Sequence, residues 1–111
     1  MDCVFCKIIA GEIPATKIYE DENVLAFLDI APAAPFHAVF VPKAHIPSAR
    51  AINAENSFLA AKIFEAAAKT AVEQNLENGF RMITNDGEDG GQTVHHLHFH
   101  LLGGRKLGAL G

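Results

Sequence analysis

Residues 54–74 carry a hydrophobic pattern with the period of an α-helix. Apolar side chains recur every three or four positions and form one stripe: Phe58, Leu59, Ile63, Phe64, Ala67 and Ala71. Asn53 stands where a helix N-cap is preferred, and Gly79 follows the last apolar position, where a helix readily ends. The sequence therefore predicts an amphipathic helix over residues 54–74 whose apolar stripe, together with Phe80, packs in the core.

Shorter apolar runs separated by turn residues predict the remaining elements. Residues 3–10 are expected to form a short helix that Gly11 ends. Strands are expected at residues 17–20, 24–28, 37–41, 80–84 and 93–102. A hairpin, separated strands and one long helix are typical of an α+β domain with a mostly antiparallel sheet. The 111 residues suffice for one such domain, residues 1–111.

The last predicted strand alternates histidines with apolar residues. Successive side chains of a strand point to opposite faces, and residues two apart lie roughly 6.5–7 Å from each other. His96, His98 and His100 are therefore expected to share one face of the strand. The residues between them share the other face, toward the core: Leu97, Phe99 and Leu101.

Three kinds of chemistry use such a row of imidazole rings. Two or three rings can bind a metal ion, one ring can act as a general acid or base, or the central ring can attack phosphorus or a carbonyl. An edge strand with exposed histidines of no function is the alternative. Three histidines in strict alternation beside a glycine-rich loop favour a functional role.

Residues 85–91, which precede this strand, form a polar loop rich in glycine. Gly90 and Gly91 leave main-chain N–H groups unobstructed by a Cβ, and Asn85 and Thr93 add side-chain donors on either side. Together these donors are expected to bind a phosphate next to the histidines. A phosphate there favours nucleophilic attack at phosphorus over a catalytic zinc ion, which usually needs three protein ligands and an open position.

Charge and hydropathy limit the classes of partner. Nine Lys and Arg residues against thirteen Asp and Glu residues give a formal charge of −4, which argues against general binding of nucleic acid. One local site can still hold a small phosphate ester. No apolar stretch approaches the ~20 residues of a membrane span, so no membrane association is expected. The N-terminal residues lack the pattern of a secretory signal, and a cytoplasmic protein is expected.

At these residues the chain resembles the histidine triad superfamily. The signature of that superfamily, H-φ-H-φ-H-φ-φ with φ apolar, is complete from His96 to Leu102. Four further segments resemble the branch of histidine triad nucleotide-binding proteins: Cys3–Pro14, Ala26–Ile30, Val41–Ile46 and Asn85–Thr93. The resemblance covers nearly the whole chain.

The resemblance implies both a fold and an activity. The fold is a five-stranded antiparallel sheet with two helices per subunit, and the sheet continues across a homodimer. The implied activity is hydrolysis of the P–N bond of purine nucleoside 5′-phosphoramidates. His98 would attack the α-phosphorus and expel an amine, and water would then cleave the nucleotidyl-histidine. Catalysis of this kind is expected to require no cofactor.

The resemblance also assigns roles to individual residues. His100 would contact the phosphate, and His37 would lie behind it as a relay partner. The main-chain carbonyl of His96 would hold the ring of His98. Six further residues would contact the nucleotide, Asp29 at the ribose, Ile30 at the base and four at the phosphate or beside it: Asn85, Gly91, Gln92 and Thr93.

Cys3 and Cys6 form a C-x-x-C motif near the N-terminus. In a reducing compartment this spacing indicates metal binding or redox chemistry before it indicates a disulfide, and no thioredoxin-like βαβ pattern supports a redox role. Resemblance to some bacterial members implies a structural zinc ion held by both cysteines, His45 and His96. Two buried thiols without a metal are the alternative.

Two further functions stay open at this point. Other branches of the superfamily hydrolyse dinucleoside polyphosphates or transfer nucleotidyl groups. The other possibility is a nucleotide-responsive interaction protein whose catalysis is incidental. The N-terminal segment and the Gly-Gly-Gln-Thr sequence before the triad favour the phosphoramidate hydrolase.

Overall fold

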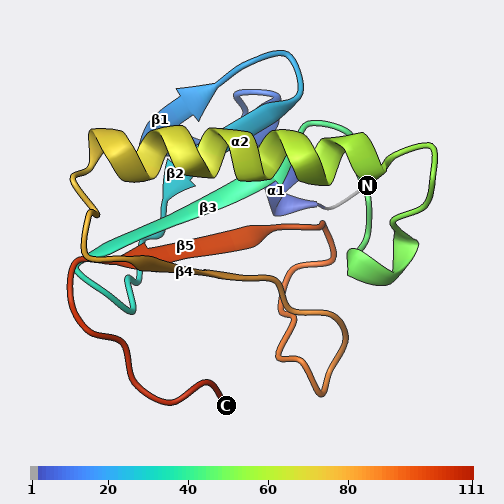
Figure 1. The fold of residues 1–111 in the computed structure, drawn as a ribbon. Coiled ribbons are helices and arrows are strands. Elements are labelled where there is room, and N and C mark those ends of the chain that lie inside the picture. The colour runs from blue at the N-terminus through green and yellow to red at the C-terminus, as the bar shows by residue number, and fades with distance from the viewer. Residues whose placement is uncertain (1–2) are drawn as a thin grey trace.

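A five-stranded antiparallel sheet organises the computed structural model, which describes residues 3–111 (Figure 1). The spatial order of its strands is β1 (Lys17–Glu20), β2 (Val24–Leu28), β3 (Phe36–Pro42), β5 (Phe99–Gly103) and β4 (Phe80–Ile83). The helices of the described residues are α1 (Val4–Ile9), the 3₁₀ helix η1 (Ala49–Ala51) and α2 (Ser57–Glu73). The predicted five-stranded antiparallel sheet with two α-helices is confirmed.

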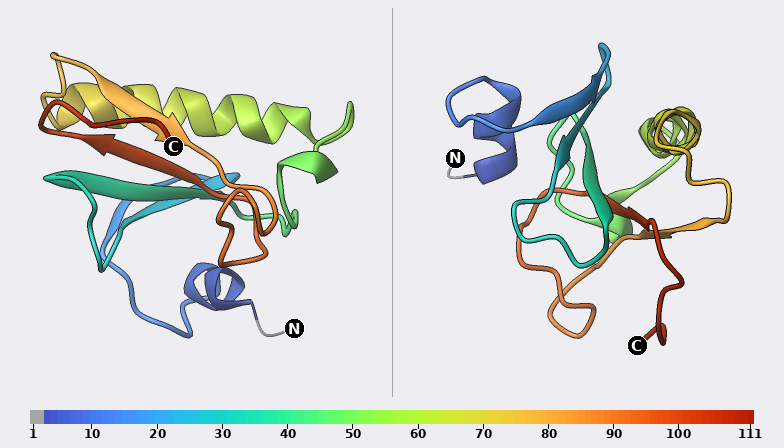
Figure 2. Two further views of the ribbon diagram at one scale, coloured as in Figure 1. Left: turned by 90° about the horizontal axis from the view of Figure 1, so that it is seen from below. Right: turned by 90° about the vertical axis from the view of Figure 1, so that its left-hand side faces the viewer.

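The two α-helices lie on opposite faces of this sheet (Figure 2). β2 and β3 are central and carry buried side chains on both faces, so alternate residues contribute to two separate cores. The core under α2 includes Val24, Ala26, Ala38, Phe40, Leu59 and Ile63. The smaller core on the α1 side is formed by Ile8, Leu25, Phe27, Val39 and Val41.

The long helix is confirmed, but its buried stripe is narrower than predicted. Asn53 holds a turn that precedes the helix, because its side-chain oxygen accepts the N–H groups of residues 55 and 56 at 2.9 and 3.1 Å. α2 itself begins at Ser57. The phenylalanines expected in the core are half exposed: Phe58 at 53%, Phe64 at 50% and Phe80 at 46%. The sheet covers only one side of α2. The prediction was wrong for the phenylalanines at the margins of that side, because it placed them in the core.

The last strand is shorter than predicted. β5 begins at Phe99, so His96 and His98 precede it and only His100 lies within the sheet. The main-chain groups of the residues before Phe99 form hydrogen bonds that do not belong to the sheet. The N–H of Leu97 donates to the loop after β3 at 2.6 Å, and the carbonyls of the two histidines accept hydrogen bonds from side chains. The predicted alternation of faces survives, because the apolar residues between the histidines join the core under α2.

The ends of α1 follow from residues at its boundaries. The Sγ atom of Cys3 accepts a hydrogen bond from the N–H of Cys6 at 3.3 Å and so caps the first turn. Gly11 adopts a φ of 80° beyond the helix, as expected of a residue that ends one. Within the described part of the chain, neither α1 nor any other helix is long and apolar enough to cross a membrane.

Candidate active site

The ring of His98 is held in one orientation and one tautomer. Its Nδ1 atom lies 2.7 Å from the main-chain carbonyl oxygen of His96. A carbonyl oxygen only accepts, so Nδ1 carries the proton and Nε2 keeps its lone pair. Phe5 of α1 packs against the ring edge to face, with the centroids 5.0 Å apart, and the Thr84 hydroxyl donates to the His98 carbonyl at 2.8 Å. His98 therefore keeps at Nε2 the lone pair that a nucleophilic imidazole needs.

His37 and His100 form a hydrogen-bonded pair whose direction the main chain determines. The N–H of Ala33 donates to Nδ1 of His37 at 3.0 Å, so the proton of this neutral ring resides on Nε2. That Nε2 lies 2.8 Å from Nδ1 of His100 and donates to it. His100 in turn carries its own proton on Nε2. Its ring lies next to that of His98, at a centroid distance of 5.1 Å. The site thus combines a nucleophilic lone pair with an adjacent N–H donor.

Burial keeps both rings of this pair uncharged at neutral pH. It lowers the pKa of His37, against the opposing effect of the Asp29 carboxylate, whose oxygen lies 3.5 Å from Nε2. Burial, together with the neighbouring rings of His98 and His37, lowers the pKa of His100 from 6.5 to about 4. Neutral rings are what the hydrogen-bond directions of the pair require.

The lowered pKa of His100 predicts a loss of stability on acidification. Below pH 6.5 the unfolded chain binds a proton at this residue, whereas the folded chain binds one only near pH 4. The free energy of unfolding therefore decreases as the pH falls through this range. The contribution of His100 is complete above pH 6.5 and lost as the pH falls toward 4. Urea unfolding at several pH values should show this decline, and His100→Asn should make it shallower. His95→Asn, at an exposed position, serves as control. Equal declines in wild type and His100→Asn would contradict the prediction.

The loop between β4 and β5 is fastened to η1 by an ion pair. The Asp86 carboxylate accepts the main-chain N–H of Arg50 at 2.8 Å and the guanidinium atoms Nε and Nη2 at 2.7 Å each. These contacts lower the pKa of Asp86 to about 2. The pair therefore stays ionised throughout the neutral range and is lost only as the pH falls from 3.8 toward 2.

Asp86→Asn is expected to impair substrate binding more than the chemical step. The amide keeps the size of the carboxylate but lacks the charge that holds Arg50, so the loop carrying Asn85 and Thr93 becomes less ordered. We expect KM for a nucleotide, the substrate that the resemblance implies, to rise about threefold to tenfold, the effect of one or two weakened hydrogen bonds, with kcat changed less. Steady-state kinetics at pH 7 measure both. Glu88→Gln, which removes a charge elsewhere in the same loop, is the matched control. A lower kcat at unchanged KM would refute this role.

Gln92 and Gly91 use their polar groups inside the loop. The amide oxygen of Gln92 accepts the N–H of Gly87 at 2.9 Å, and its amide nitrogen donates to two main-chain carbonyls. The main-chain N–H groups of Gly91 and Gln92 donate to carbonyls of residues 88 and 87 at 3.0 Å. The main-chain N–H of Gly91, which was expected to be free for a phosphate, therefore bonds within the turn in this conformation, because the turn closes on itself. The Gln92 side chain holds the loop.

Of the other predicted substrate residues, Asp29 contacts a histidine of the site directly. Asn85 directly follows Thr84, whose hydroxyl contacts the triad. One oxygen of Asp29 accepts the N–H of residue 31 at 2.8 Å, and the other faces the His37 ring. Ile30 is fully exposed and Thr93 is exposed, so both are accessible to a ligand. Their contacts with a nucleotide stay predictions.

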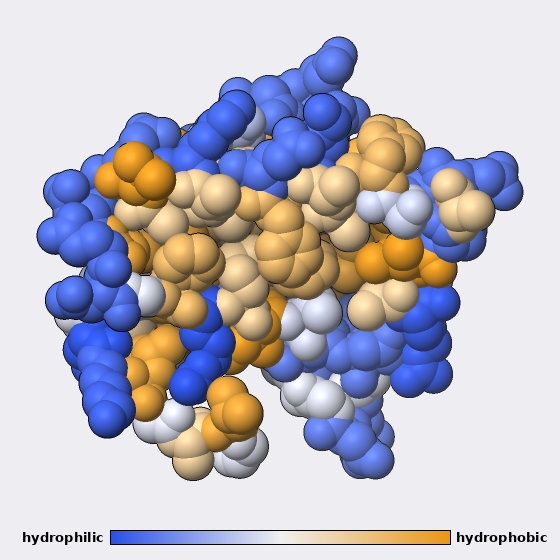
Figure 3. Space-filling model, in the orientation of Figure 1, coloured by the Kyte–Doolittle hydropathy of each residue, from blue (hydrophilic) through white to orange (hydrophobic). Residues whose placement is uncertain are grey.

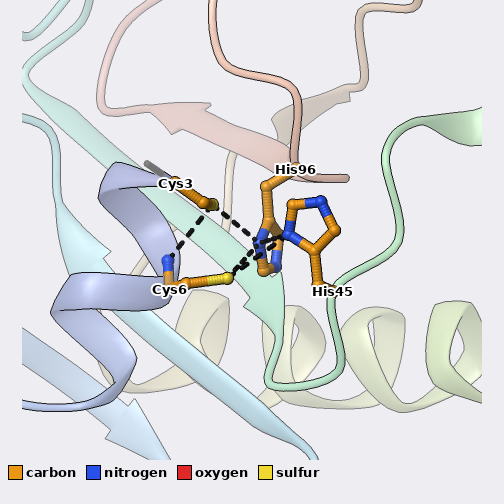
Figure 4. Close-up of side chains that lie close together, drawn as sticks. All are labelled: Cys3, Cys6, His45 and His96. Carbon is orange, nitrogen blue, oxygen red and sulfur yellow. Dashed lines mark hydrogen bonds between the residues drawn. The ribbon is translucent and has the colours of Figure 1, made fainter. Parts of the chain in front are cut away.

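A second cluster joins the start of α1 to the first histidine of the triad (Figure 4). Cys3, Cys6, His45 and His96 point toward one another, and their ligand atoms all lie within 4.8 Å. Sγ of Cys3 is 3.3 Å from Nδ1 of His96, Sγ of Cys6 is 3.3 Å from Nδ1 of His45, and the two Nδ1 atoms are 3.1 Å apart. The four residues predicted as zinc ligands are thus brought together.

The donor atoms of this cluster fit a tetrahedral zinc ion. Zinc bonds of about 2.0–2.3 Å place neighbouring ligand atoms roughly 3.3–3.8 Å apart, close to the distances observed. Nε2 of His96 lies 2.9 Å from the carbonyl of Pro42 and must donate to it, which leaves Nδ1 as a lone pair aimed at the sulfurs. Burial and the adjacent Cys3 raise the pKa of the Cys6 thiol. Both thiols can therefore ionise together only if a bound cation stabilises the two thiolates.

Comparison with known proteins identifies the family. A family model described as "Scavenger mRNA decapping enzyme C-term binding" matches residues 2–108. A solved histidine triad protein from Clostridium difficile superimposes with a TM-score of 0.96 at 48% sequence identity, covering 100% of this chain and 97% of that one. The chain belongs to the histidine triad family.

Two further relatives match nearly the whole chain. The purine nucleoside phosphoramidase of Escherichia coli is 42% identical over 110 residues, which are 98% of this chain and 92% of that protein. A HIT family hydrolase from Clostridium thermocellum has a TM-score of 0.95 and 50% identity, covering 98% and 96% of the two chains. These relatives place the chain among the hydrolases of the histidine triad family.

Three contributors to this histidine triad site were not predicted from the sequence: Phe5, Arg50 and the main-chain N–H of Ala33. Phe5 lies in a segment with an amphipathic pattern, which indicates burial but not a partner. Arg50 and Ala33 carry no motif at all. They act through the loops that bring them to Asp86 and His37, and only the folded chain shows those contacts.

Proposed function

We propose that this protein hydrolyses the P–N bond of purine nucleoside 5′-phosphoramidates through a nucleotidyl-histidine on His98. The observation that carries the proposal is the fixed tautomer of His98, whose Nε2 lone pair lies beside the N–H donor of His100. The similarity to a purine nucleoside phosphoramidase supports the P–N bond as the one that is cleaved. Nucleotide chemistry is also consistent with the polar loop next to the triad.

The reaction takes place in two displacements at phosphorus. Nε2 of His98 attacks the α-phosphorus, the P–N bond breaks, and the nitrogen takes up a proton from the solvent and leaves as an amine. The positive charge that develops on the His98 ring is stabilised at Nδ1–H by the carbonyl of His96. His100 donates its Nε2–H to a phosphate oxygen. Water then attacks the same phosphorus and releases a proton to the solvent, the bond to His98 breaks so that its ring is neutral again, and the nucleoside monophosphate leaves.

The surroundings of the triad supply the nucleotide contacts in this proposal. Asp29 accepts the ribose hydroxyls with the carboxylate that faces His37, and Ile30 packs against the base with its exposed side chain. Asn85 and Thr93 donate to the phosphate from the two ends of the loop, and Gly91 allows the turn between them with its φ of 81°. Gln92 acts indirectly, by holding the loop.

Parallel assays with two substrates test the proposed function. Wild-type protein is incubated with adenosine 5′-monophosphoramidate and, separately, with a diadenosine polyphosphate, and AMP release is measured. Samples quenched during turnover are digested and searched by mass spectrometry for adenylyl-histidine. AMP from the phosphoramidate with an adduct on His98 supports the proposal. Faster turnover of the dinucleotide would indicate a dinucleoside polyphosphate hydrolase. Tight AMP binding with no turnover of either substrate would indicate an interaction protein.

We propose further that the Cys3, Cys6, His45 and His96 cluster holds a structural zinc ion. Such an ion supplies a cross-link between α1, the loop after β3 and the segment before β5. Two thiolates and two imidazoles fill a tetrahedral set and leave no open position for a substrate. Cys3, Cys6 and His45 would therefore stabilise the fold and take no part in hydrolysis. The hydrolytic steps would be carried out by His98 and His100.

We also propose a homodimer formed through β4. β1 and β4 are the edge strands of the sheet. The β1 edge carries Lys17 and Glu20, paired with each other at 3.5 Å, and such charges discourage strand pairing. The β4 edge is mostly apolar, and half-exposed Phe58, Phe64 and Phe80 lie on it and on the adjoining α2. An apolar band crosses this face of the molecule (Figure 3). A second copy pairing with β4 would cover it and continue the sheet.

Phe80→Asp should therefore weaken self-association while leaving the fold intact. The side chain is 46% exposed in the single chain, so its main loss would be at the interface. We expect at least about a thirtyfold increase in the dissociation constant, the equivalent of an interface side chain worth ~2 kcal/mol. Sedimentation velocity over a concentration series measures it, with Lys17→Glu on the opposite edge as control. A wild-type chain that sediments as a monomer at high concentration would refute the dimer.

A further inference from the structure

The chain turns back toward the candidate active site directly after β5. Gly104 has a φ of 97°, and a Cβ at this position would lie 2.8 Å from Cβ of Pro35. Only glycine permits both the left-handed turn and this close approach. The residues that follow are thereby brought to the loop between β2 and β3, which leads into the start of β3, where His37 lies.

Arg105 contacts that loop through its guanidinium group. Nη2 donates to the main-chain carbonyl of Ala33 at 3.1 Å, and Nη1 donates to the carbonyl of Lys106 at 2.9 Å, which restrains the side chain itself. The N–H of the same Ala33 donates to Nδ1 of His37 at 3.0 Å. Both main-chain groups of Ala33 are thus in use, one toward Arg105 and the other toward the histidine pair.

The position of Ala33 decides which nitrogen of His37 carries a proton. While its N–H points at Nδ1, the proton of His37 stays on Nε2, and His100 presents N–H at its own Nε2. If Ala33 moves away, Nδ1 of His37 loses its donor, and only the Asp29 carboxylate, 3.5 Å from Nε2, still favours a proton on Nε2, so the second tautomer becomes accessible. In the alternative tautomer the pair reverses direction, and His100 presents a lone pair where the phosphate needs a donor.

We propose that Arg105 is a positioning residue for hydrolysis, acting through Ala33 and His37 on the tautomer of His100. The inference rests on the proposed function for its kinetic consequence, but the tautomer itself is observable without a substrate. Arg105 lies at the exposed surface and touches neither the nucleophile nor the loop of residues 85–92 in the structure. Its effect is therefore on the donor state of His100.

The test compares Arg105→Ala with three other variants by kinetics and by NMR of the histidine rings. Lys106→Ala removes the neighbouring cation, and Arg81→Ala removes an arginine that donates to the carbonyl of Gly108 at 3.0 Å in the same C-terminal segment. Arg105→Lys retains a donor and a charge and should restore part of the effect. Long-range ¹H–¹⁵N spectra report the protonated nitrogen of His37 and His100 in each ligand-free variant.

We expect Arg105→Ala alone to lower kcat about threefold to tenfold, as for the loss of one hydrogen bond, with KM within about twofold of wild type. In its spectra Nδ1 and Nε2 of His37 should move toward a mixture of tautomers. In a His37→Ala background the same substitution should have no further effect on kcat. Unchanged His37 spectra, or an equal loss of kcat in both backgrounds, would overturn the proposal. A wild-type chain that lacks phosphoramidate hydrolysis would refute the proposed function but not the tautomer result.

Discussion

Replacing His98 with alanine is expected to lower kcat for AMP release from a nucleoside phosphoramidate by about a thousandfold or more. Loss of a covalent nucleophile removes the two-step route altogether, and losses of this size or larger follow in enzymes that depend on one. The remaining parts of the site do not compensate. His100 still presents a donor, but no lone pair stands beside it.

The measurement is AMP formation over long incubations at high enzyme concentration, together with a search for the adenylyl adduct. His95→Ala, which removes the exposed histidine before the triad, controls for the loss of an imidazole as such. His98→Ala should bind AMP with affinity close to wild type, which separates lost chemistry from lost structure. Turnover by His98→Ala equal to that of the wild type would eliminate His98 as the nucleophile.

Removal of zinc is expected to lower the melting temperature by about 10 °C. Protein purified without added metal should contain about one zinc ion per chain, since four deprotonated ligands form a closed site. A free zinc concentration of about a hundred times Kd stabilises the folded state by ~2.7 kcal/mol. In a domain of this size each kcal/mol shifts the melting temperature by about 4 °C or more.

Melting curves with and without a strong chelator measure this effect, and elemental analysis gives the metal content. The control is a Cys3→Ser/Cys6→Ser variant, whose curve should resemble that of the chelated wild type and should not respond to the chelator. The serine side chain at position 3 can still accept the main-chain N–H of residue 6, so the cap of α1 is retained. A metal content near zero, with a melting temperature insensitive to chelation, would leave two buried thiols as the correct interpretation.

Local patterns were sufficient to predict most of the fold. The long helix, the early hairpin and the sides taken by residues 96–101 follow from periodicity, which depends only on neighbours in sequence. The order of the strands does not, because β5 inserts between β3 and β4 through contacts distant in sequence. The three phenylalanines were misplaced for a related reason. Phenylalanine is typical of a core, so the sequence placed Phe58, Phe64 and Phe80 there. The single sheet does not extend far enough to cover these side chains, and they stay half exposed.

The length of the last strand shows where pattern and structure diverge. Alternation of histidines and apolar residues predicted a ladder over residues 93–102, yet β5 begins at Phe99. The carbonyls of His96 and His98 are used by a ring and by the Thr84 hydroxyl instead of by a neighbouring strand. Side-chain partners that replace ladder hydrogen bonds leave no trace in hydropathy, so the sequence could not reveal this boundary.

The chemistry of the candidate site was predictable in residue identity but not in protonation. The motif and its resemblance singled out His37, His96, His98 and His100. Which nitrogen of each ring bears the proton depends on whether a carbonyl or an N–H faces it. Those partners are main-chain groups of ordinary residues such as Ala33 and Pro42, and their positions emerge only from the folded chain.

His96 contributes to both clusters through different parts of the same residue. Its ring faces the cysteines and donates to Pro42, whereas its main-chain carbonyl fixes the tautomer of His98. Every amino acid has that carbonyl, so a descendant of this chain with an apolar residue at 96 and no cysteines would keep the hydrogen bond to the His98 ring. The proposed zinc site and the proposed hydrolysis can therefore be inherited separately. The two clusters share a residue but no atom.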